Sequence, residues 1–341
     1  MPYFRAAAPA AASTPERIGV LVVNLGTPDS ASYFAVQRYL REFLGDRRVI
    51  DTSRLIWLPL LYGLVLPFRP LRTARKYRKV WMPEGSPLAV YSQRLASKLD
   101  LKLQDALGDR VRVALGMTYG NPSVANAIDS LTGQNVRRLL VLPLYPQYCA
   151  STIGSVFDIA SRALQRLRWL PETRFVNGYC EDAGYIDALA ERVQRHWDEV
   201  GERSHLLLSY HGIQEAYVKR GDPYQAQTQA TTRLLVARLG LRPEDWSLCY
   251  QSRFGSTAWL KPYTDDMLKE LARRGLRKLT VVAPSFAVDC LETLEEVAIE
   301  YRERFLSLGG ERLSLVPALN DDDRHAEALL AIVNNRLQGW I

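Results

Sequence analysis

The sequence predicts an α/β fold with two similar halves, each a parallel β-sheet flanked by helices. Short runs of apolar and β-branched residues indicate strands that are covered on both faces. Helical patterns separate these runs, and such alternation is typical of parallel sheets. The chain has 341 residues, and domains usually have roughly 100–200, so we expect two domains.

Five runs are expected to be buried strands. They are 18–25 (IGVLVVNL), 111–117 (VRVALGM), 136–145 (VRRLLVLPLY), 205–212 (HLLLSYHG) and 276–284 (LRKLTVVAP). Helical patterns are found at 123–133, 184–200, 227–240 and 325–340. Each half is expected to pack its helices on both faces of its own sheet.

One strand in each half ends in a polar loop that contains glycine, NLGTPD (24–29) in the first half and SYHGIQ (209–214) in the second. Active sites of open α/β sheets lie beyond the carboxyl ends of strands, so we expect a pocket between the halves. The expected domains are 16–148 and 149–322, with a C-terminal helix, 323–341, packing back on the first domain.

Composition excludes several classes of protein. The net charge of +7 comes from 44 basic and 37 acidic residues that are dispersed, which argues against a nucleic-acid tail but suits an anionic substrate or membrane surface. No GxGxxG or GxxxxGK[ST] motif is present, so NAD and ATP lack their usual binding loops. The four cysteines are far apart in sequence (Cys149, Cys180, Cys249, Cys290). This spacing argues against a zinc ribbon, a disulfide scaffold or an iron–sulfur cluster, and fits a reducing compartment.

Two N-terminal segments bear on membranes. The leader 1–17 has no aliphatic core, so we expect a disordered leader rather than a signal peptide. We expect Pro59, Gly63 and Pro67 to interrupt the most apolar stretch, 55–68 (LIWLPLLYGLVLPF), which is also shorter than the ~20 residues of a membrane span. We expect no transmembrane helix there. With the arginines around it, segment 54–81 is either an amphipathic core element or an apolar lip that covers a flat ligand or dips into a membrane.

His211 is the strongest single candidate for chemistry. It ends an apolar strand, is followed by Gly212, and precedes the turn sequence GDPY (221–224). A lone histidine is often a core or turn residue, but at a strand's carboxyl end it can face the expected pocket. Imidazole is both a metal ligand and a base near neutral pH.

A second candidate is the acidic set Asp289, Glu292 and Glu296, which opens an expected helix after the strand at 276–284. Offsets of three and four residues place these carboxylates on one face of an α-helix, while Glu295 is expected to face solvent. A solvated acidic face is the alternative. One histidine with carboxylates would form a weak, open site for a cation such as Fe²⁺, suited to delivering the metal rather than keeping it.

These residues lie in segments that resemble bacterial ferrochelatases. SYHGIQEAYVKRGDPY (209–224) is similar to the signature of that family, with His211 at its histidine. The other similar blocks occur in the family's order, from about 18 to 330. They are VNLGTPDS (23–30), YLREFLGDRRVIDTSRLIWLPLLYG (39–63), EGSPLAVYS (84–92), LGMTYGNPS (115–123), LPLYPQYCASTIGS (142–155), YQSRFGSTAWLKPYTDDML (250–268) and VDCLETLEE (288–296). Gln214 and Ser285 depart from the pattern, where relatives have Pro and Gly, so the geometry of the His211 loop is in question.

The resemblance implies two Rossmann-like domains around a porphyrin cleft, and the insertion of Fe²⁺ into protoporphyrin IX to give protoheme. It assigns His211 and Glu292 as the catalytic, metal-binding pair, with Asp289 and Glu296 as an acidic relay. The residues it places against the porphyrin are Leu25 and Tyr119, with Arg69 or Arg72 on the propionates.

The resemblance also implies that iron is a substrate, with no permanent cofactor and no [2Fe–2S] cluster. It implies a cytoplasmic protein, at the inner-membrane surface if the lip makes peripheral contact, that binds no nucleic acid and is a monomer or weak dimer. Three other functions are a cobalt or nickel chelatase for another tetrapyrrole, a porphyrin carrier without catalysis, and a nucleotide-binding module that uses LGTPDS. The choice between protoporphyrin and coproporphyrin stays open.

Overall fold

The computed structural model describes residues 4, 15–255 and 257–341, so most of the leader expected to be disordered lies outside the described residues. The chain divides into two compact units. Unit 1 comprises Met1–Tyr145, Ala150–Gly178 and Asp321–Ile341, and unit 2 comprises Pro146–Cys149 and Tyr179–Asn320. Segment 150–178 therefore belongs to unit 1, beyond the boundary expected at 148, because its strand β4 (Glu172–Phe175) pairs with β3 of that unit.

The sheet of unit 1 has the strand order β2-β1-β3-β4, and all its pairs are parallel. Its other strands are β1 (Arg17–Thr27), β2 (Val111–Gly120) and β3 (Val136–Pro143). The central strand β1 is buried along most of its length, as expected for a strand covered on both faces. The strands expected at 18–25, 111–117 and 136–145 are confirmed.

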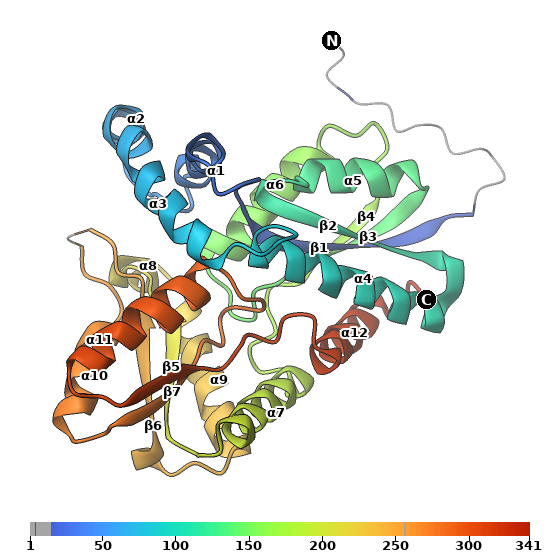
Figure 1. Ribbon diagram of the computed structural model, residues 1–341. Coiled ribbons are helices and arrows are strands. Elements are labelled where there is room, and N and C mark those ends of the chain that lie inside the picture. The colour runs from blue at the N-terminus through green and yellow to red at the C-terminus, as the bar shows by residue number, and fades with distance from the viewer. Residues whose placement is uncertain (1–3, 5–14, 256) are drawn as a thin grey trace. The chain divides into compact units, whose positions relative to one another are not determined.

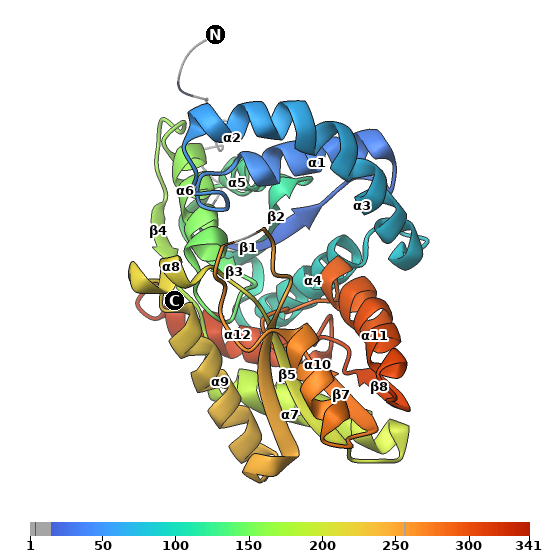
Figure 2. The same cartoon turned by 90° about the vertical axis from the view of Figure 1, so that its left-hand side faces the viewer.

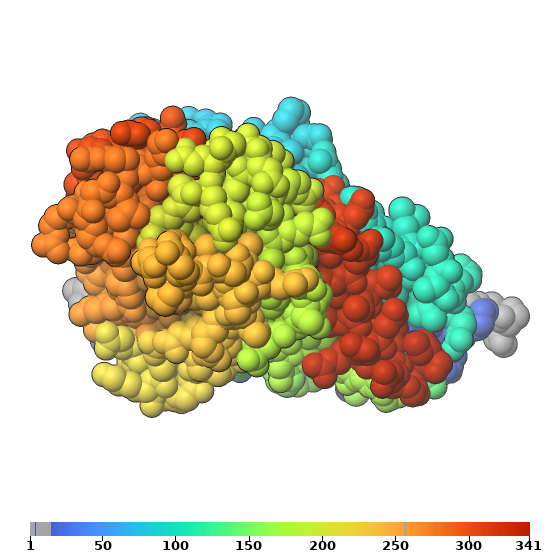
Figure 3. Space-filling model, turned by 90° about the horizontal axis from the view of Figure 1, so that it is seen from below, coloured from blue at the N-terminus to red at the C-terminus, as the bar shows by residue number. Residues whose placement is uncertain are grey.

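Helices cover both faces of this sheet (Figure 1). The helices of unit 1 are α1 (Tyr33–Gly45), α2 (Arg54–Leu60), α3 (Leu66–Val80), α4 (Pro87–Leu107), α5 (Val124–Gly133), α6 (Ser155–Leu164) and α12 (Asp323–Leu337), with a π-helical turn, Ala150–Gly154, before α6 and a 3₁₀ turn, Gly108–Arg110, after α4. Side chains of α5 and α6, including Ile128 and Val156, share a core with Leu21 and Val141 of the sheet. On the other face α12 lies beside α4 (Figure 3), where Lys98 pairs with Asp323 at 2.9 Å.

Residues 54–80 form one continuous helical segment, which corrects the expectation that Pro59, Gly63 and Pro67 interrupt it. α2 passes through a π-helical turn, Leu61–Val65, directly into α3, and the segment bends along its length (Figure 2). Local π geometry lets a helix accommodate prolines that remove backbone donors. By length and composition alone these 27 residues could cross a membrane, and only 22% of their most apolar window is buried. Because a core helix can also pass that test, it is weak evidence for a span.

Unit 2 repeats the sheet plan of unit 1, with the order β6-β5-β7-β8 and parallel pairs throughout. Its strands are β5 (His205–His211), β6 (Trp246–Gln251), β7 (Lys278–Val282) and β8 (Arg312–Leu315). The strands expected at 205–212 and 276–284 are confirmed. The sheets and their flanking helices confirm an α/β protein with two Rossmann-like domains.

The helices of unit 2 also lie on both faces of the sheet (Figure 1). They are α7 (Ala183–Val200), α8 (Glu215–Lys219), α9 (Tyr224–Arg238), α10 (Thr264–Arg273), η5 (Glu292–Tyr301), a π-helix, and α11 (Arg302–Ser307), with a 3₁₀ turn at Pro243–Asp245. Leu268 of α10, Val297 of η5 and Phe305 of α11 pack in one core with Leu207 and Leu279. On the opposite face, the indole of Trp197 in α7 donates to the Thr280 hydroxyl at 3.0 Å.

Candidate active site

His211 is the last residue of β5 and is half-buried. Its ring Nδ1 lies 2.7 Å from the carbonyl oxygen of Gly212, so Nδ1 carries the proton and donates this bond. The hydrogen bond made by one ring nitrogen fixes the role of the other. In the neutral imidazole Nε2 therefore carries the lone pair, which can bind a metal ion or accept a proton.

The carboxylates after β7 lie on a π-helix rather than the expected α-helix. η5 begins at Glu292 and ends at Tyr301. A π-helix closes i→i+5 hydrogen bonds and has more residues per turn than an α-helix, so residues four and five apart share a face. This register aligns Glu292, Glu296 and Tyr301. It also turns Glu295 inward, where it is 1% exposed, which corrects the expectation that Glu295 faces solvent.

Four donors surround the carboxylate of Glu296. Its Oε1 accepts from the backbone N–H of Ser252 at 3.0 Å and from the Tyr301 hydroxyl at 2.7 Å. Its Oε2 accepts from the Ser252 hydroxyl at 2.6 Å and from the Gln251 side-chain amide at 3.3 Å. Burial raises the pKa of Glu296, and the hydrogen bonds from Ser252 and Tyr301 oppose that shift.

His211, Glu292 and Glu296 are close enough to interact electrostatically. The His211 charge lowers the pKa of Glu296 and the Glu292 charge raises it, both less than burial does. The side chain of Glu292 also contacts the thiol of Cys290, whose pKa is raised by burial and by that carboxylate. Because the thiolate is the form that binds metals, Cys290 is a poor ligand, and the candidate metal-binding groups are the His211 imidazole and the Glu292 carboxylate.

Asp289 is engaged elsewhere. It is 3% exposed, and its Oδ1 accepts from the Thr293 hydroxyl at 2.9 Å and the Ala318 N–H at 3.2 Å. Its Oδ2 accepts from the Asn320 side-chain amide at 2.8 Å. These bonds tie the start of η5 to the loop after β8. The relay role expected for Asp289 stays a prediction that this bonding does not favour.

The two porphyrin-facing candidates of unit 1 differ in exposure. Leu25, near the carboxyl end of β1, is half-buried. Tyr119, near the end of β2, is only 3% exposed, and its hydroxyl donates to Asp46 at 2.8 Å. Burial raises the pKa of Tyr119. Leu25 is therefore accessible to a ligand, whereas the buried Tyr119 is not.

The lip helix, residues 54–80, buries only part of its apolar surface. Trp57 and Leu61 are buried, and the Trp57 indole donates to the Leu44 carbonyl at 2.7 Å. The exposed apolar side chains of this helix are Leu55, Ile56, Leu58, Leu60, Tyr62, Leu64, Phe68 and Leu71. Arg69 is half-buried and Arg72 is exposed, both in α3. Apolar and basic groups thus follow one another along a single helix.

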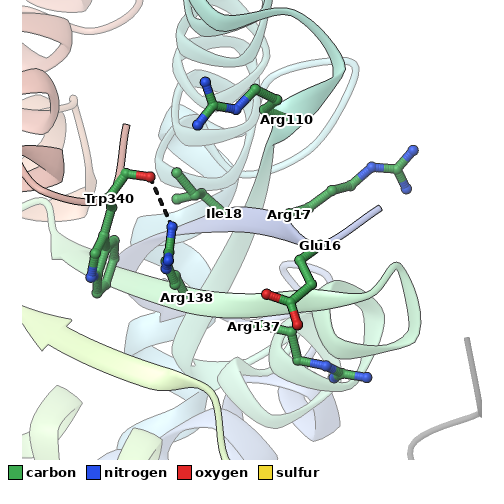
Figure 4. A pocket seen from close by; sticks show the side chains of 7 residues that line it. All are labelled: Glu16, Arg17, Ile18, Arg110, Arg137, Arg138 and Trp340. Atoms are coloured by element: carbon green, nitrogen blue, oxygen red, sulfur yellow. Dashed lines mark hydrogen bonds between the residues drawn. The ribbon is translucent and has the colours of Figure 1, made fainter. Parts of the chain in front are cut away.

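An arginine-rich pocket of about 40 Å³ lies in unit 1 at the amino ends of β1 and β3, away from Leu25 (Figure 4). Arg138 donates to the Trp340 carbonyl at 2.9 Å, and Arg17 pairs with Asp109 at 2.9 Å. These arginines hold backbone and acidic groups near the chain's C-terminal end. The pocket contains none of the predicted site residues.

The sequence analysis missed three residues that hold the site, namely Gln251, Ser252 and Tyr301. Gln251 ends β6, a strand that was not expected, so its place beside His211 was not apparent. Tyr301 is nine residues beyond Glu292, and only the π register brings it to Glu296. The strand-like run WSLCYQ (246–251), followed by polar residues, was the available signal.

Among described residues, no group of three or more His, Cys, Asp or Glu is arranged to hold a metal ion.

Structure comparison finds the same fold in other proteins. Solved structures with the same fold include SirB from Bacillus subtilis with Fe3+, with a TM-score of 0.54 and 13% identity over 94% of this chain and 95% of that one. Another is CbiX, described as the terminal enzyme for biosynthesis of siroheme in denitrifying bacteria, with a TM-score of 0.51 and 12% identity over 93% and 98%. The chain has the two-domain fold of the chelatases.

Sequence comparison identifies the family to which the chain belongs. The ferrochelatase family model matches residues 17–337. The ferrochelatase of Thioalkalivibrio sulfidiphilus is 49% identical over 327 residues, covering 96% of this chain and 89% of the relative. Ferrochelatase 1 of Shewanella oneidensis is 47% identical over 323 residues, covering 95% and 97%. The chain belongs to the ferrochelatase family.

Proposed function

We propose that this protein inserts Fe²⁺ into protoporphyrin IX, releasing two protons and forming protoheme, the terminal step of heme biosynthesis. The observation that carries the proposal is family membership along nearly the whole chain. A chelatase must hold a weakly bound cation beside a base, and His211 with Glu292 provides such groups in unit 2. Iron is then a substrate rather than a resident cofactor.

His211 is the proposed base and metal-binding residue. Metal insertion requires two very weakly acidic pyrrole N–H groups to lose their protons. The Nδ1 bond to the Gly212 carbonyl leaves Nε2 with its lone pair, and a base positioned in this way contributes about 10²–10⁴-fold to rate. The same nitrogen can bind Fe²⁺ before the porphyrin does, because imidazole suits this cation.

Glu292 is the proposed carboxylate partner of His211. Two protein ligands leave most coordination positions of Fe²⁺ open, so the four pyrrole nitrogens of a porphyrin can outcompete them. A structural site, by contrast, is closed by four strong ligands.

Unit 1 is proposed to contact the macrocycle. Leu25 offers apolar surface, and Tyr119 near the end of the neighbouring strand is fixed by its bond to Asp46. Arg72, exposed on α3, suits a propionate, and Arg69 is one turn earlier on the same helix. Contacts that favour a distorted macrocycle over a flat one would lower the barrier to metal entry.

The lip helix is also proposed to dock on the membrane surface. Leu55 is 89% exposed and Phe68 is 63% exposed, and α3 continues with basic residues toward its C-terminal end. A helix that inserts apolar side chains and places basic residues beside them suits an anionic bilayer. Each basic residue near the surface strengthens binding by ~1 kcal/mol. The protein would act on the cytoplasmic side, where a poorly soluble porphyrin could reach it through the lipid.

The test is anaerobic incubation with Fe²⁺ and protoporphyrin IX, following the Soret band. Formation of protoheme is expected, with slower turnover of coproporphyrin. Parallel reactions use sirohydrochlorin with Co²⁺. If cobalt enters sirohydrochlorin and no protoheme forms, the protein is a chelatase for another tetrapyrrole. Faster insertion into coproporphyrin would keep the ferrochelatase activity and change its substrate.

A further inference from the structure

The Glu296 carboxylate has no vacant acceptor position. An ionised carboxylate offers about four lone-pair sites on two oxygens. Each oxygen of Glu296 accepts from two donors, at 3.0 and 2.7 Å on Oε1 and at 2.6 and 3.3 Å on Oε2. A metal ion could bind Glu296 only by displacing one of these donors.

The backbone conformation of Ser252 allows this residue to donate two of these four hydrogen bonds. Its φ is +63°, a left-handed conformation that non-glycine residues adopt rarely and at a cost. The conformation allows its N–H and its hydroxyl to reach different oxygens of the same carboxylate. Ser252 is strained and supplies half of the donors to the half-buried Glu296 carboxylate, which indicates that this contact is a specific feature of the fold.

Gln251 connects this contact to His211. It is 1% exposed and lies opposite His211 in the β5–β6 ladder. Its backbone carbonyl accepts from the Gly212 N–H at 2.9 Å. Its side-chain amide donates to Glu296 and to the Glu292 carbonyl, each at 3.3 Å. One side chain therefore links the end of the histidine strand to the start of the π-helix.

We propose that Glu296 is a positioning residue, a saturated carboxylate that fixes η5 against the end of β5, and that Gln251, Ser252 and Tyr301 hold it there. It does not bind or relay the metal. Its role is to set the position of Glu292 relative to His211, which must be held within about 0.5 Å for efficient chemistry. The proposal deepens the proposed function and rests on it where turnover is measured.

Steady-state kinetics separate positioning from metal delivery. Tyr301→Phe and Ser252→Ala each remove one hydroxyl donor, and Glu296→Gln removes the charge. We expect kcat to fall about tenfold in the first two and about 30-fold in the third, because small displacements of reacting groups cost up to about 10²-fold. KM for Fe²⁺ should stay within about twofold. The matched control is Glu303→Gln, an exposed glutamate of α11, which should behave as wild type.

A double-mutant cycle tests whether Tyr301 acts through Glu296. The double variant Glu296→Gln/Tyr301→Phe should be no slower than Glu296→Gln alone. Multiplicative losses in that variant, or a tenfold rise in KM for Fe²⁺ with kcat retained, would overturn the proposal. Tyr301→Phe and Ser252→Ala each delete a single hydroxyl, so they keep the test valid if Glu296→Gln fails to fold.

The second readout does not need turnover. Co²⁺ is added to the protein without porphyrin, and its visible absorption reports the ligand set. Titration followed by this absorption should show Co²⁺ affinity falling far more in Glu292→Gln than in Tyr301→Phe or Glu296→Gln. A loss of Co²⁺ affinity in Glu296→Gln equal to that in Glu292→Gln would make Glu296 a ligand and refute the proposal. If wild type forms no protoheme, the proposed function fails while this titration still decides the role of Glu296.

Discussion

The two units share one architectural plan. Each has four parallel strands with its first strand in the second position of the sheet, β2-β1-β3-β4 in unit 1 and β6-β5-β7-β8 in unit 2. In each unit a π-helix follows the third strand, Ala150–Gly154 after β3 and Glu292–Tyr301 after β7. Equivalent positions therefore exist at the carboxyl ends of β1 and β5.

The chemistry at those positions differs. Unit 1 carries 26 Lys and Arg against 16 Asp and Glu, a net +10, whereas unit 2 carries 18 against 21, a net −3. β1 ends near Leu25 and β5 ends at His211. The π-helix of unit 1 has no acidic residue, and that of unit 2 has four glutamates. The two units therefore have similar backbones at the carboxyl ends of their strands but different side chains. The basic unit 1 suits an anionic ligand such as a porphyrin, and the acidic unit 2 suits a cation.

The largest effect is expected at the end of β5. His211→Ala should lower turnover about 1,000-fold, within the range for loss of a general base, while the far-UV circular dichroism stays the same. The matched control is His205→Ala, at the amino end of the same strand, which should retain most activity. Equal losses in both variants would show that the strand's stability, not the imidazole of His211, is being measured.

The π-helix gives the next largest effect. Glu292→Gln should cut kcat about 100-fold, since it keeps the shape of the side chain and removes the charge. Glu303→Gln, on the exposed side of α11, should change it less than twofold. Glu295 is unsuitable as a control because its side chain is buried. If Glu292→Gln is as active as Glu303→Gln, the acidic character of unit 2 is unrelated to metal transfer.

Gly26 in unit 1 and Gly212 in unit 2 lie at the ends of corresponding strands, so substituting each compares how tightly the two strand ends are packed. Gly26, at the end of β1, has φ +100°, and an added Cβ would lie 1.7 Å from the Tyr119 carbonyl oxygen. At Gly212, after β5, the nearest atom would be 3.0 Å away. Gly26→Ala should lower the free energy of unfolding by about 2 kcal/mol, and Gly212→Ala by about 1 kcal/mol. Urea unfolding measures both, and a larger loss at Gly212 would reverse the comparison.

The smallest effect concerns the lip helix of unit 1. Leu64→Ser/Phe68→Ser should weaken binding to anionic vesicles about tenfold, through lost apolar burial, and added salt should weaken wild-type binding. Leu64 and Phe68 are 55% and 63% exposed, and the control Leu101→Ser alters a side chain of α4 that is 62% exposed. Co-sedimentation that is unchanged in the double variant would exclude this helix as a membrane contact.

Most of the fold could be predicted because its central strands are apolar and long. The strands that were missed lack this signal. β4 (ETRF) and β8 (RLSL) are four-residue edge strands with charged or polar side chains, and β6 (WSLCYQ) mixes polar and apolar residues. Edge strands are often short and polar, so periodicity does not reveal them.

The site was predicted in part for a related reason. His211 was found from its place at a strand end, a position that sequence can indicate. The π-helix could not be anticipated, because the sequence was interpreted with α-helical spacing and the hydrogen-bond pattern depends on tertiary packing. That error placed Glu295 outside and left Tyr301 unconnected to Glu296. Likewise residues 54–80 form a continuous helix although local rules treat its three prolines, Pro59, Pro67 and Pro70, as interruptions.

The central claim is that His211 in unit 2 binds the metal substrate. Fe K-edge X-ray absorption of the anaerobic protein loaded with Fe²⁺, without porphyrin, tests it most directly. Wild type and His205→Ala should show scattering from one imidazole bound to iron, and His211→Ala should lose it. An imidazole contribution in His211→Ala equal to that of wild type would contradict the account.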